Sequence, residues 1–272
     1  MKGIKAAAGL ALVSVAVIIS AMVMAAIING TPGDDTLTDT PGNDVIRGFA
    51  GDDEITSNFR NDRIDGGEDD DQVLVTSAGR AYVVGGPGND IIVSAQTGAF
   101  SVQRFFGGDG DDNIIIETSY HGSRVEAGDG DDVIDINNIQ GNNLIYGGDG
   151  NDEIEAIDST ANNKIYGGPG QDNITLGSGS NFVEGGEDAD VIVAGTAPTS
   201  RDVINIRVGD VPAGETEKIT CTVDPGATTT VILKRSSQGS FPRTTPTQFD
   251  TSGVLTIVDP ATGGVYEIKR NS

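Results

Sequence analysis

The feature that most constrains this 272-residue chain is a nine-residue unit that recurs eleven times between residues 30 and 195. GGDGDDNII, from Gly107, and GGDGNDEIE, from Gly147, are typical copies. The first five units follow one another directly from residue 30, whereas the later ones begin at residues 85, 107, 127, 147, 167 and 185. A period this regular predicts a solenoid, in which each unit takes the same place in a successive coil.

Two positions of the unit keep their character in every copy. The sixth is always aspartate, namely Asp35, Asp44, Asp53, Asp62, Asp71, Asp90, Asp112, Asp132, Asp152, Asp172 and Asp190. The eighth is always aliphatic, namely Leu37, Ile46, Ile55, Ile64, Val73, Ile92, Ile114, Ile134, Ile154, Ile174 and Ile192. Residues two apart in an extended segment share a face, so we expect the sixth and eighth positions to point inward together. The glycines before them suit a tight turn that needs positive φ.

A second apolar stripe lies two residues before the start of each later unit. It consists of Ile64, Val83, Phe105, Val125, Ile145, Ile165 and Val183. We interpret this stripe as a second strand in each coil, which faces the first strand across a thin core. The predicted fold class is therefore all-β, with a parallel β-roll or narrow β-solenoid over residues 30–195.

Negative charge is concentrated in the same segment. The chain has a net charge of −24, and residues 30–195 carry 33 acidic against 7 basic side chains. A nucleic-acid surface needs clustered lysine and arginine, so this balance argues against nucleic acid and favours a cation as the partner. Stacked coils would place neighbouring sixth-position carboxylates about 5 Å apart, where they repel by about 3 kcal/mol at a dielectric of about 20. Ca²⁺ is the expected ion, because it accepts oxygen-only ligands in a flexible geometry.

Units such as GGPGNDIIV, GGDGDDNII and GGPGQDNIT resemble the hemolysin-type (RTX) calcium-binding nonapeptide GGxGxDxUx, in which U is a large aliphatic residue. The resemblance covers residues 30–195. It implies a right-handed parallel β-roll with several Ca²⁺ ions held between the turns of successive coils. The implied ligands are turn carbonyls and the carboxylates of the eleven aspartates named above.

Some units depart from this pattern. Arg60 stands at the fourth position of its unit, where glycine is usual, and Asp69 and Asp188 replace that glycine in theirs, which would distort the turn or add a ligand. After residue 66 the motif returns on only one of the two edges expected for a coil. We therefore predict a ladder of up to eight calcium sites on one edge, and at most one weak site on the other, between the units that start at 39 and 57. That other edge is rich in asparagine, which favours neutral, hydrogen-bonded turns.

The two ends of the chain differ from the repeat region. Residues 1–29 have a basic start and an uncharged run over 6–28, which predicts either a signal peptide cleaved after Ala25 or a retained membrane anchor. Either one places the rest of the chain outside the cytoplasm, secreted or at the cell surface. Residues 196–272 are neutral and strand-like, and VLTIVDPATGGVYEIK is the clearest hairpin. We expect a small antiparallel β module there that caps the roll or binds a partner.

The remaining candidate residues do not form a catalytic set. His121 is the only histidine and lies in an expected turn, Cys221 lies in an expected strand, and Tyr146 and Tyr166 occupy matching outward positions one coil apart. We interpret them as a surface residue, a small buried residue and packing partners. A sugar-binding strip on the two tyrosines is the alternative to that packing role.

Taken together, these patterns predict an extracellular calcium-binding β-roll with a structural or adhesive role. Its expected partners are calcium ions and a cell-surface or extracellular-matrix polymer, or a second copy of the chain. Two alternatives stay open: a secreted enzyme that cleaves or epimerises acidic polysaccharides, and a subunit of a calcium-dependent filament. The enzyme would need basic side chains that converge on one exposed groove. The irregular spacing of those in the repeat region predicts dispersal: Arg47, Arg60, Arg63, Arg80, Arg104, Arg124 and Lys164.

Overall fold

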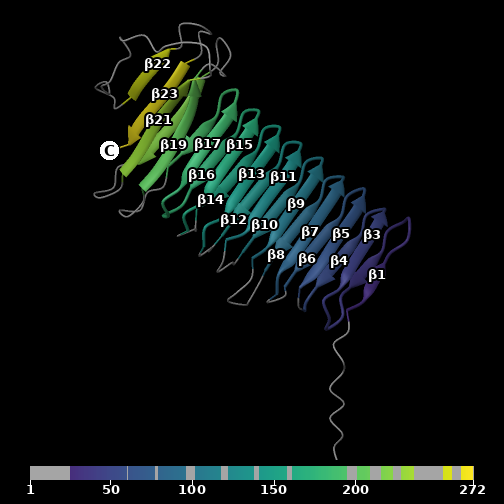
Figure 1. The fold of residues 1–272 in the computed structure, drawn as a ribbon. Helices are drawn as coiled ribbons and strands as arrows, with labels where there is room; N and C mark the ends of the chain where they lie inside the picture. Colours follow the sequence, from purple (N-terminus) through teal and green to yellow (C-terminus); the bar gives the residue numbers. More distant parts are fainter. Residues whose placement is uncertain are drawn as a thin grey trace, which may run out of the picture.

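The computed structural model describes residues 25–59, 61–76, 79–95, 102–117, 122–137, 141–157, 161–194, 201–208, 216–222, 228–235, 254–258 and 265–271. Within these ranges the secondary structure consists of β-strands, which stack into a long rod (Figure 1). Most of the predicted leader (residues 1–24), Arg60 and His121 lie outside the described residues. In the ranges given above, the structure contains no helix of the length and apolarity that crossing a membrane requires.

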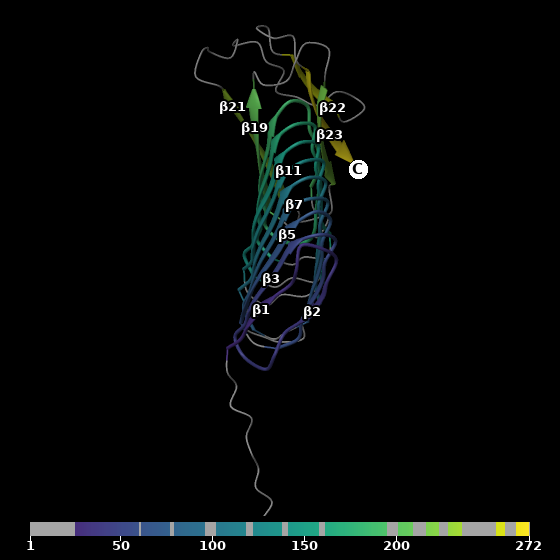
Figure 2. The ribbon, with the colours of Figure 1, turned by 90° about the vertical axis from the view of Figure 1, so that its right-hand side faces the viewer.

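The strands form two long sheets. The eleven-stranded sheet contains β1 (Ile27–Asn29), β3 (Val45–Ala50), β5 (Asp62–Glu68), β7 (Ala81–Pro87), β9 (Arg104–Asp109), β11 (Arg124–Asp129), β13 (Leu144–Asp149), β15 (Lys164–Pro169), β17 (Phe182–Glu187), β19 (Arg201–Val208) and β21 (Thr228–Arg235). The twelve-stranded sheet contains β2 (Thr36–Thr38), β4 (Glu54–Ser57), β6 (Gln72–Val75), β8 (Ile91–Ser94), β10 (Asn113–Ile116), β12 (Val133–Ile136), β14 (Glu153–Ala156), β16 (Asn173–Leu176), β18 (Val191–Val193), β20 (Thr216–Thr222), β22 (Val254–Val258) and β23 (Val265–Asn271). The chain alternates between the sheets, which face each other across a narrow interior (Figure 2). The predicted all-β parallel β-solenoid is confirmed.

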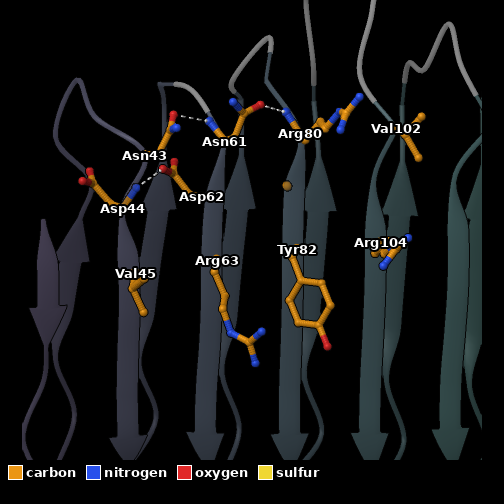
Figure 3. Close-up of a pocket in the computed structure, with 11 residues that line it drawn as sticks. Asn43, Asp44, Val45, Asn61, Asp62, Arg63, Arg80, Tyr82, Val102 and Arg104 are labelled. Atoms are coloured by element: carbon orange, nitrogen blue, oxygen red, sulfur yellow. Dashed lines mark hydrogen bonds between the residues drawn. The ribbon is translucent and has the colours of Figure 1, made fainter. Parts of the chain in front are cut away.

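Successive coils pair in parallel and in register, so equivalent residues form columns along the rod. Ile114 of β10 pairs with Ile134 of β12, for example, although the coils differ in length. Figure 3 shows one outward column of the eleven-stranded sheet, in which Val45, Arg63, Tyr82 and Arg104 stand on neighbouring strands. A residue's place in the repeat therefore determines which face of the rod it occupies.

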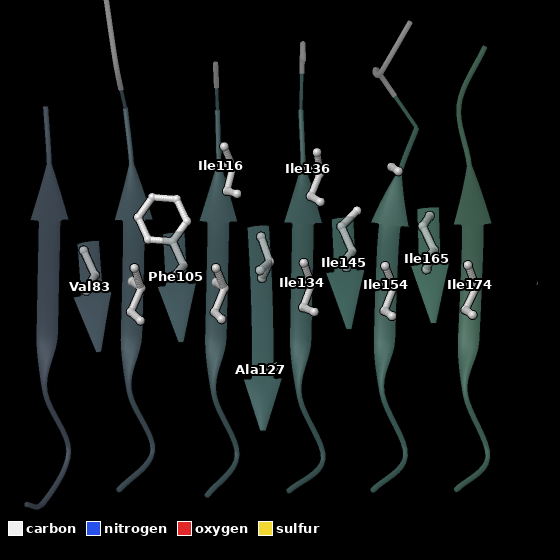
Figure 4. Close-up of a cluster of buried hydrophobic side chains, with 14 of the residues drawn as sticks. Val83, Phe105, Ile116, Ala127, Ile134, Ile136, Ile145, Ile154, Ile165 and Ile174 are labelled. Carbon is white, nitrogen blue, oxygen red and sulfur yellow. The ribbon is translucent and has the colours of Figure 1, made fainter. Parts of the chain in front are cut away.

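The two predicted apolar stripes form the core. Ile134, at an eighth position, is fully buried, and so are Phe105 and Ile145 of the second stripe, which come from the opposite sheet. Ile136, two residues beyond Ile134, is also fully buried. Figure 4 shows these side chains filling the space between the strands of the two sheets. The inward alternation predicted from the unit is confirmed, and burial of these columns is the main apolar contribution to stability.

The turns that follow the strands of the eleven-stranded sheet form what we call the first edge of the rod. Gly108, near the end of β9 where the chain enters this turn, has a φ of 142°, a conformation that a side chain makes costly. Neighbouring turns are hydrogen-bonded to each other, since the N–H of Gly110 donates to the carbonyl of Asp129 in the next coil at 2.7 Å. Asp69 and Asp188, where the unit usually has glycine, keep a positive φ of 79° and 72°. The chain therefore still turns at these two substituted units.

The C-terminal segment continues the roll before it changes pattern. β19 and β20 pair in parallel with β17 and β18, and β21 pairs in parallel with β19. The predicted hairpin is confirmed as the antiparallel pair β22 and β23. Among the described residues of 196–272, the expected antiparallel pairing occurs only between β22 and β23, since β23 is parallel to β20. At the other end β1 lies inside the predicted leader and pairs with β3; cleavage after Ala25 would leave β1 intact.

Candidate functional site

The eleven sixth-position aspartates separate into two columns. Asp44 directly precedes β3, and Asp62 is the first residue of β5. Both lie on the opposite side of their coils, which we call the second edge. The others lie on the first edge, one per coil: Asp35, Asp53, Asp71, Asp90, Asp112, Asp132, Asp152, Asp172 and Asp190. All eleven are buried except Asp35, which is half-buried. The structure thus gathers nine of the candidate ligands into a single inward column.

A ladder of backbone hydrogen bonds runs through the first-edge column. The N–H of each aspartate donates to Oδ1 of the aspartate in the next coil, at 2.7 to 3.0 Å from Asp35 through Asp190. An amide hydrogen therefore stands between consecutive carboxylates. This arrangement reduces the repulsion between neighbouring carboxylates. From the sequence alone, we expected a cation to offset all of that repulsion.

The second carboxylate oxygen distinguishes the interior aspartates from those near the N-terminal end. Oδ2 is buried and has no hydrogen-bond partner in Asp53, Asp71, Asp90, Asp112, Asp132, Asp152 and Asp172. By contrast, Oδ2 of Asp35 accepts from Thr31, Oδ2 of Asp44 accepts from Thr40, and Oδ2 of Asp62 accepts from Ser57. A buried acceptor without a partner costs about 1–3 kcal/mol. Seven consecutive first-edge carboxylates thus have an unmet need for a donor or a cation.

Six of the seven unpartnered oxygens face a small space beside the first glycine of their own unit, whereas the unit of Asp132 begins with Ala127. A Cβ built on Gly107 would lie 2.0 Å from Oδ2 of Asp112 and 2.5 Å from the carbonyl oxygen of Ala127 in the next coil. At Gly167 the corresponding distances are 2.0 Å, to Oδ2 of Asp172, and 2.5 Å, to the carbonyl oxygen of Gly185. Only glycine leaves this space open. A carboxylate oxygen and a carbonyl oxygen that face one gap fit the oxygen-only donor set of Ca²⁺.

Burial also makes the charged form of these carboxylates unfavourable. Desolvation, with added repulsion from neighbouring carboxylates, raises the pKa of Asp112 and of Asp172 to about 8 against the opposing effect of the amide hydrogen bonds. The same leading cause raises the pKa of Asp132 to about 7 and that of Asp152 to about 6. These carboxylates must ionise to bind a metal, and burial disfavours the ionised form. A bound cation would offset that cost.

Side chains alone do not make a metal cluster here. Across the described ranges, no group of three or more His, Cys, Asp or Glu side chains is placed to hold one ion. Calcium on the first edge would therefore depend on backbone carbonyls as well as on the aspartates. Such ligation is possible because the parallel register brings the carbonyl of one coil beside the carboxylate of the previous one.

The second edge carries a mainly neutral polar ladder. Its column contains Asp44, Asp62, Ala81, Gln103, Ser123, Asn143, Asn163, Asn181 and Asp202, all of them buried. The side-chain amide of Asn143 donates to Oδ1 of Asn163 at 2.7 Å, while its own Oδ1 accepts the N–H of Ser123 at 2.8 Å. The hydrogen-bonded asparagine edge predicted from the sequence is confirmed. Sequence reasoning missed Asp202, although Ile204 two residues later repeats the aspartate-x-aliphatic signal of the unit.

The irregular spacing of the basic side chains predicted that they are dispersed, but the structure places most of them on one face. Five of the six that the structure describes point outward from the eleven-stranded sheet: Arg47, Arg63, Arg104, Arg124 and Lys164. Arg80 lies at the edge of the same face, where it lines a cavity with Arg63 and Arg104. The prediction was wrong because coils of unequal length hide the register: residues 18 to 22 apart in sequence stand side by side in the sheet.

Comparison with known proteins agrees with the repeat pattern. The family model described as the RTX calcium-binding nonapeptide repeat matches residues 29–59, 55–77, 140–156 and 157–192. A search of curated proteins gave no match. Among solved structures, the chain is similar to a hyperactive, Ca²⁺-dependent, β-helical antifreeze protein from an Antarctic bacterium, with 18% identity, a TM-score of 0.43, and coverage of 81% of this chain and 83% of that one. The matched segments of this chain are similar to RTX calcium-binding nonapeptide repeats, and they stack as coils of a parallel β-roll.

Proposed function

We propose that this protein is an extracellular β-roll whose coils are held together by several calcium ions along the first edge. The observation that carries the proposal is the run of seven buried aspartates, from Asp53 to Asp172, whose Oδ2 atoms have no partner. Each faces a glycine-lined gap that a Cβ would fill and that a carbonyl oxygen of the next coil also borders, wherever the first residue of the unit is glycine. The family match supports calcium as the ion.

The chain's own groups would supply the ligands and the calcium would supply positive charge. Asp112, for example, would contribute Oδ2, and the carbonyl of Ala127 would contribute a second oxygen from the next coil. Oδ1 would keep its backbone hydrogen bond, which orients the carboxylate. An ion present at ten times its dissociation constant stabilises the folded state by about 1.4 kcal/mol per site. Several such sites would equal a typical margin of stability of about 5–15 kcal/mol.

This stabilisation suits a structural or adhesive role at the cell surface or outside the cell. Calcium is abundant there, and a rod that becomes stable on meeting it would fold after export. The apolar run over residues 6–28 supports export, either as a cleaved signal or as an anchor. The C-terminal strands support a cap for the last coil or a site for a partner, since β22 forms one edge of the twelve-stranded sheet.

The test is a calcium titration of the full chain after treatment with EDTA. We expect circular dichroism to show a gain of sheet with calcium, and differential scanning calorimetry to show a higher melting temperature. The variant Asp112→Asn removes one first-edge carboxylate beside a glycine-lined gap, and Asp111→Asn removes the same charge from an exposed neighbour whose Oδ1 bond is retained. Calorimetric titration should find fewer bound ions in Asp112→Asn and the wild-type number in Asp111→Asn.

Two results would overturn the proposal. One is a spectrum and a melting temperature that do not respond to millimolar calcium. The other is an equal loss of bound ions in both variants, which would mean that only the general negative charge of the edge attracts calcium. Magnesium serves as the ion control, because its rigid octahedral preference predicts weaker stabilisation than calcium at the same concentration.

A further inference from the structure

The outward face of the eleven-stranded sheet contains a basic groove that the calcium sites do not use. A cavity of about 580 Å³ opens there over β3, β5, β7 and β9. Arg63, Arg80 and Arg104 line it, together with Tyr82 and Asn61 (Figure 3). These residues come from consecutive coils, and the parallel register brings them onto one surface.

The three guanidinium groups in this groove are exposed and have no acidic partner. None of Arg63, Arg80 and Arg104 forms an ion pair within the described part of the chain. Asp44 and Asp62 also line the cavity, but both are buried and their carboxylates accept hydrogen bonds from the chain. The groove therefore presents an excess of positive charge on a protein whose net charge is −24. Exposed, unpaired arginines in such a setting indicate an anionic ligand.

The opposite face shows that this distribution is specific to one side. From β2 to β18, the outward residues of the twelve-stranded sheet that the structure describes include no lysine or arginine. They include acidic residues instead, such as Glu54, Asp135 and Glu155. From β2 to β18, the described part of the rod thus has basic side chains on one face and none at the outward positions of the other.

Aromatic rings and amides accompany the charges in the groove. The Arg63 guanidinium lies 4.6 Å from the centre of the Tyr82 ring, and the centres of the Tyr82 and Phe106 rings are 5.3 Å apart. Asn61 uses its Oδ1 to accept the N–H of Arg80, and no hydrogen bond of the described residues engages its side-chain N–H groups. Charged donors, free amides and an aromatic surface side by side are the groups that recognise a carboxylated sugar, whose hydroxyls accept hydrogen bonds and whose C–H face stacks on rings.

The same face continues towards the C-terminus with a second hollow. This cavity, of about 660 Å³, lies over β13, β15 and β17 and is lined by Tyr146, Tyr166 and Lys164. The two tyrosine rings are stacked, with centres 5.0 Å apart and an angle of 13° between them. Arg124, on β11 between the two hollows, is instead paired with Glu126. A linear ligand that runs along the rod would meet basic groups at one hollow and stacked rings at the other.

We propose that this face binds an acidic polysaccharide, with its carboxylates on Arg63, Arg80 and Arg104. Neighbouring strands stand about 4.8 Å apart, a distance comparable with the length of one pyranose unit, so successive sugars match successive coils. A nucleic acid fits less well, because duplex DNA carries a charge about every 1.7 Å along its axis, a spacing much shorter than the distance between neighbouring coils. This inference goes beyond the calcium proposal and uses none of its ligands.

The experiment measures binding of a short oligogalacturonate to the full chain by calorimetry in calcium-containing buffer. We expect binding that weakens as salt increases, and no binding of a neutral malto-oligosaccharide of equal length. The decisive comparison is Arg104→Ala against Arg124→Ala, because these arginines are neighbours in one outward column but only Arg104 is unpaired and lies in the groove. Arg104→Ala should weaken binding about tenfold, and Arg124→Ala should leave it within about twofold.

Both arginines are exposed, so their replacement should leave the circular dichroism spectrum and the melting temperature unchanged. The proposal is overturned if the oligogalacturonate does not bind, or if the two variants weaken binding equally. It is also overturned if a single-stranded oligonucleotide of equal charge binds as tightly as the sugar. Failure of this experiment would leave the calcium proposal intact, since calcium binding to the first edge is measured separately and without any sugar.

Discussion

The backbone N–H of Asp112 donates a hydrogen bond of 2.7 Å to Oδ1 of Asp132 in the next coil, while Oδ2 of both residues is buried without a partner. Oδ1 of each carboxylate therefore helps to hold the coils together, whereas Oδ2 lacks a hydrogen-bond donor or a cation. The same division repeats along the first edge, which makes stability there depend on protons or on cations. Because neighbouring sites share this ladder, loss of one should affect the next.

Without calcium, the folded chain should lose stability as pH rises from about 4 to about 8. The pKa of Asp112 is 3.8 in the unfolded reference and about 8 in the fold because of burial, so the folded state binds more protons between these values. Stability is then complete below the lower pKa and falls as pH rises through the higher one, by up to about 1.4 kcal/mol per pH unit for each such group. Urea unfolding in EDTA at a series of pH values measures this.

Saturating calcium should remove most of that pH dependence above pH 6, because a bound cation favours the ionised carboxylate. The Asp132→Asn variant provides the control, since it cannot ionise and should show a shallower decline in EDTA. A metal-free protein that becomes more stable between pH 5 and pH 8 would contradict the raised pKa values of this column.

Ala127→Gly should increase the stabilisation that calcium produces. Ala127 is the first residue of its unit, and at the equivalent glycines a Cβ would lie about 2 Å from the aspartate Oδ2, as at Gly147 with 2.1 Å to Asp152. Removing the methyl group opens the gap beside Asp132. The melting temperatures of the variant and the wild type, each with and without calcium, measure the effect. Without calcium, the variant should show only the destabilisation caused by a new glycine, about 0.5–1 kcal/mol.

The reverse substitution, Gly147→Ala, is the matched control. It places a methyl group 2.1 Å from Oδ2 of Asp152, in the space where the ion would lie, and should reduce the calcium-dependent rise in melting temperature. If both variants show the wild-type calcium increment, the space beside the first residue is not where the ion lies.

Asn143→Asp should destabilise the fold by about 1–3 kcal/mol at neutral pH. The side-chain amide of Asn143 donates to Oδ1 of Asn163 at 2.7 Å, and a carboxylate has no hydrogen to give there, so two buried oxygens would meet. Asn142→Asp adds the same charge at an exposed neighbour and should change stability by less than about 0.5 kcal/mol. Chemical unfolding in calcium compares them; equal stabilities would show that the asparagine ladder is not required on this edge.

Phe49→Gly should leave the protein more stable than Phe59→Gly by about 1–2 kcal/mol. Phe49 occupies the second position of its unit, where glycine is usual, and adopts a φ of 93° with its side chain 47% exposed. Phe59 is similarly exposed, at 45%, but does not have a positive φ. Glycine therefore relieves backbone strain at the first site and only adds chain entropy at the second. Thermal unfolding distinguishes the two, and equal losses would argue against strain at Phe49.

The local pattern was sufficient to predict the β-roll, its core and the side of the coil on which each aspartate lies. Alternation in an extended chain places residues two apart on one face, so the aspartate of each unit and Ile134 or its equivalents had to point inward together. A short period repeated eleven times leaves few other ways to bury so many aliphatic residues. The asparagine edge followed from the same period.

The relations between coils depended on the tertiary structure. Which oxygens of the aspartates are satisfied is decided by the register between coils, which places the N–H of Asp112 against Asp132 and leaves Oδ2 to face a carbonyl. Asp202 joined the second-edge column, and Arg63, Arg80 and Arg104 met in one groove, across segments of unequal length. Sequence spacing cannot show such neighbours, because a loop of any length can return the chain to the same register while hydrogen bonds between parallel strands determine which residues meet.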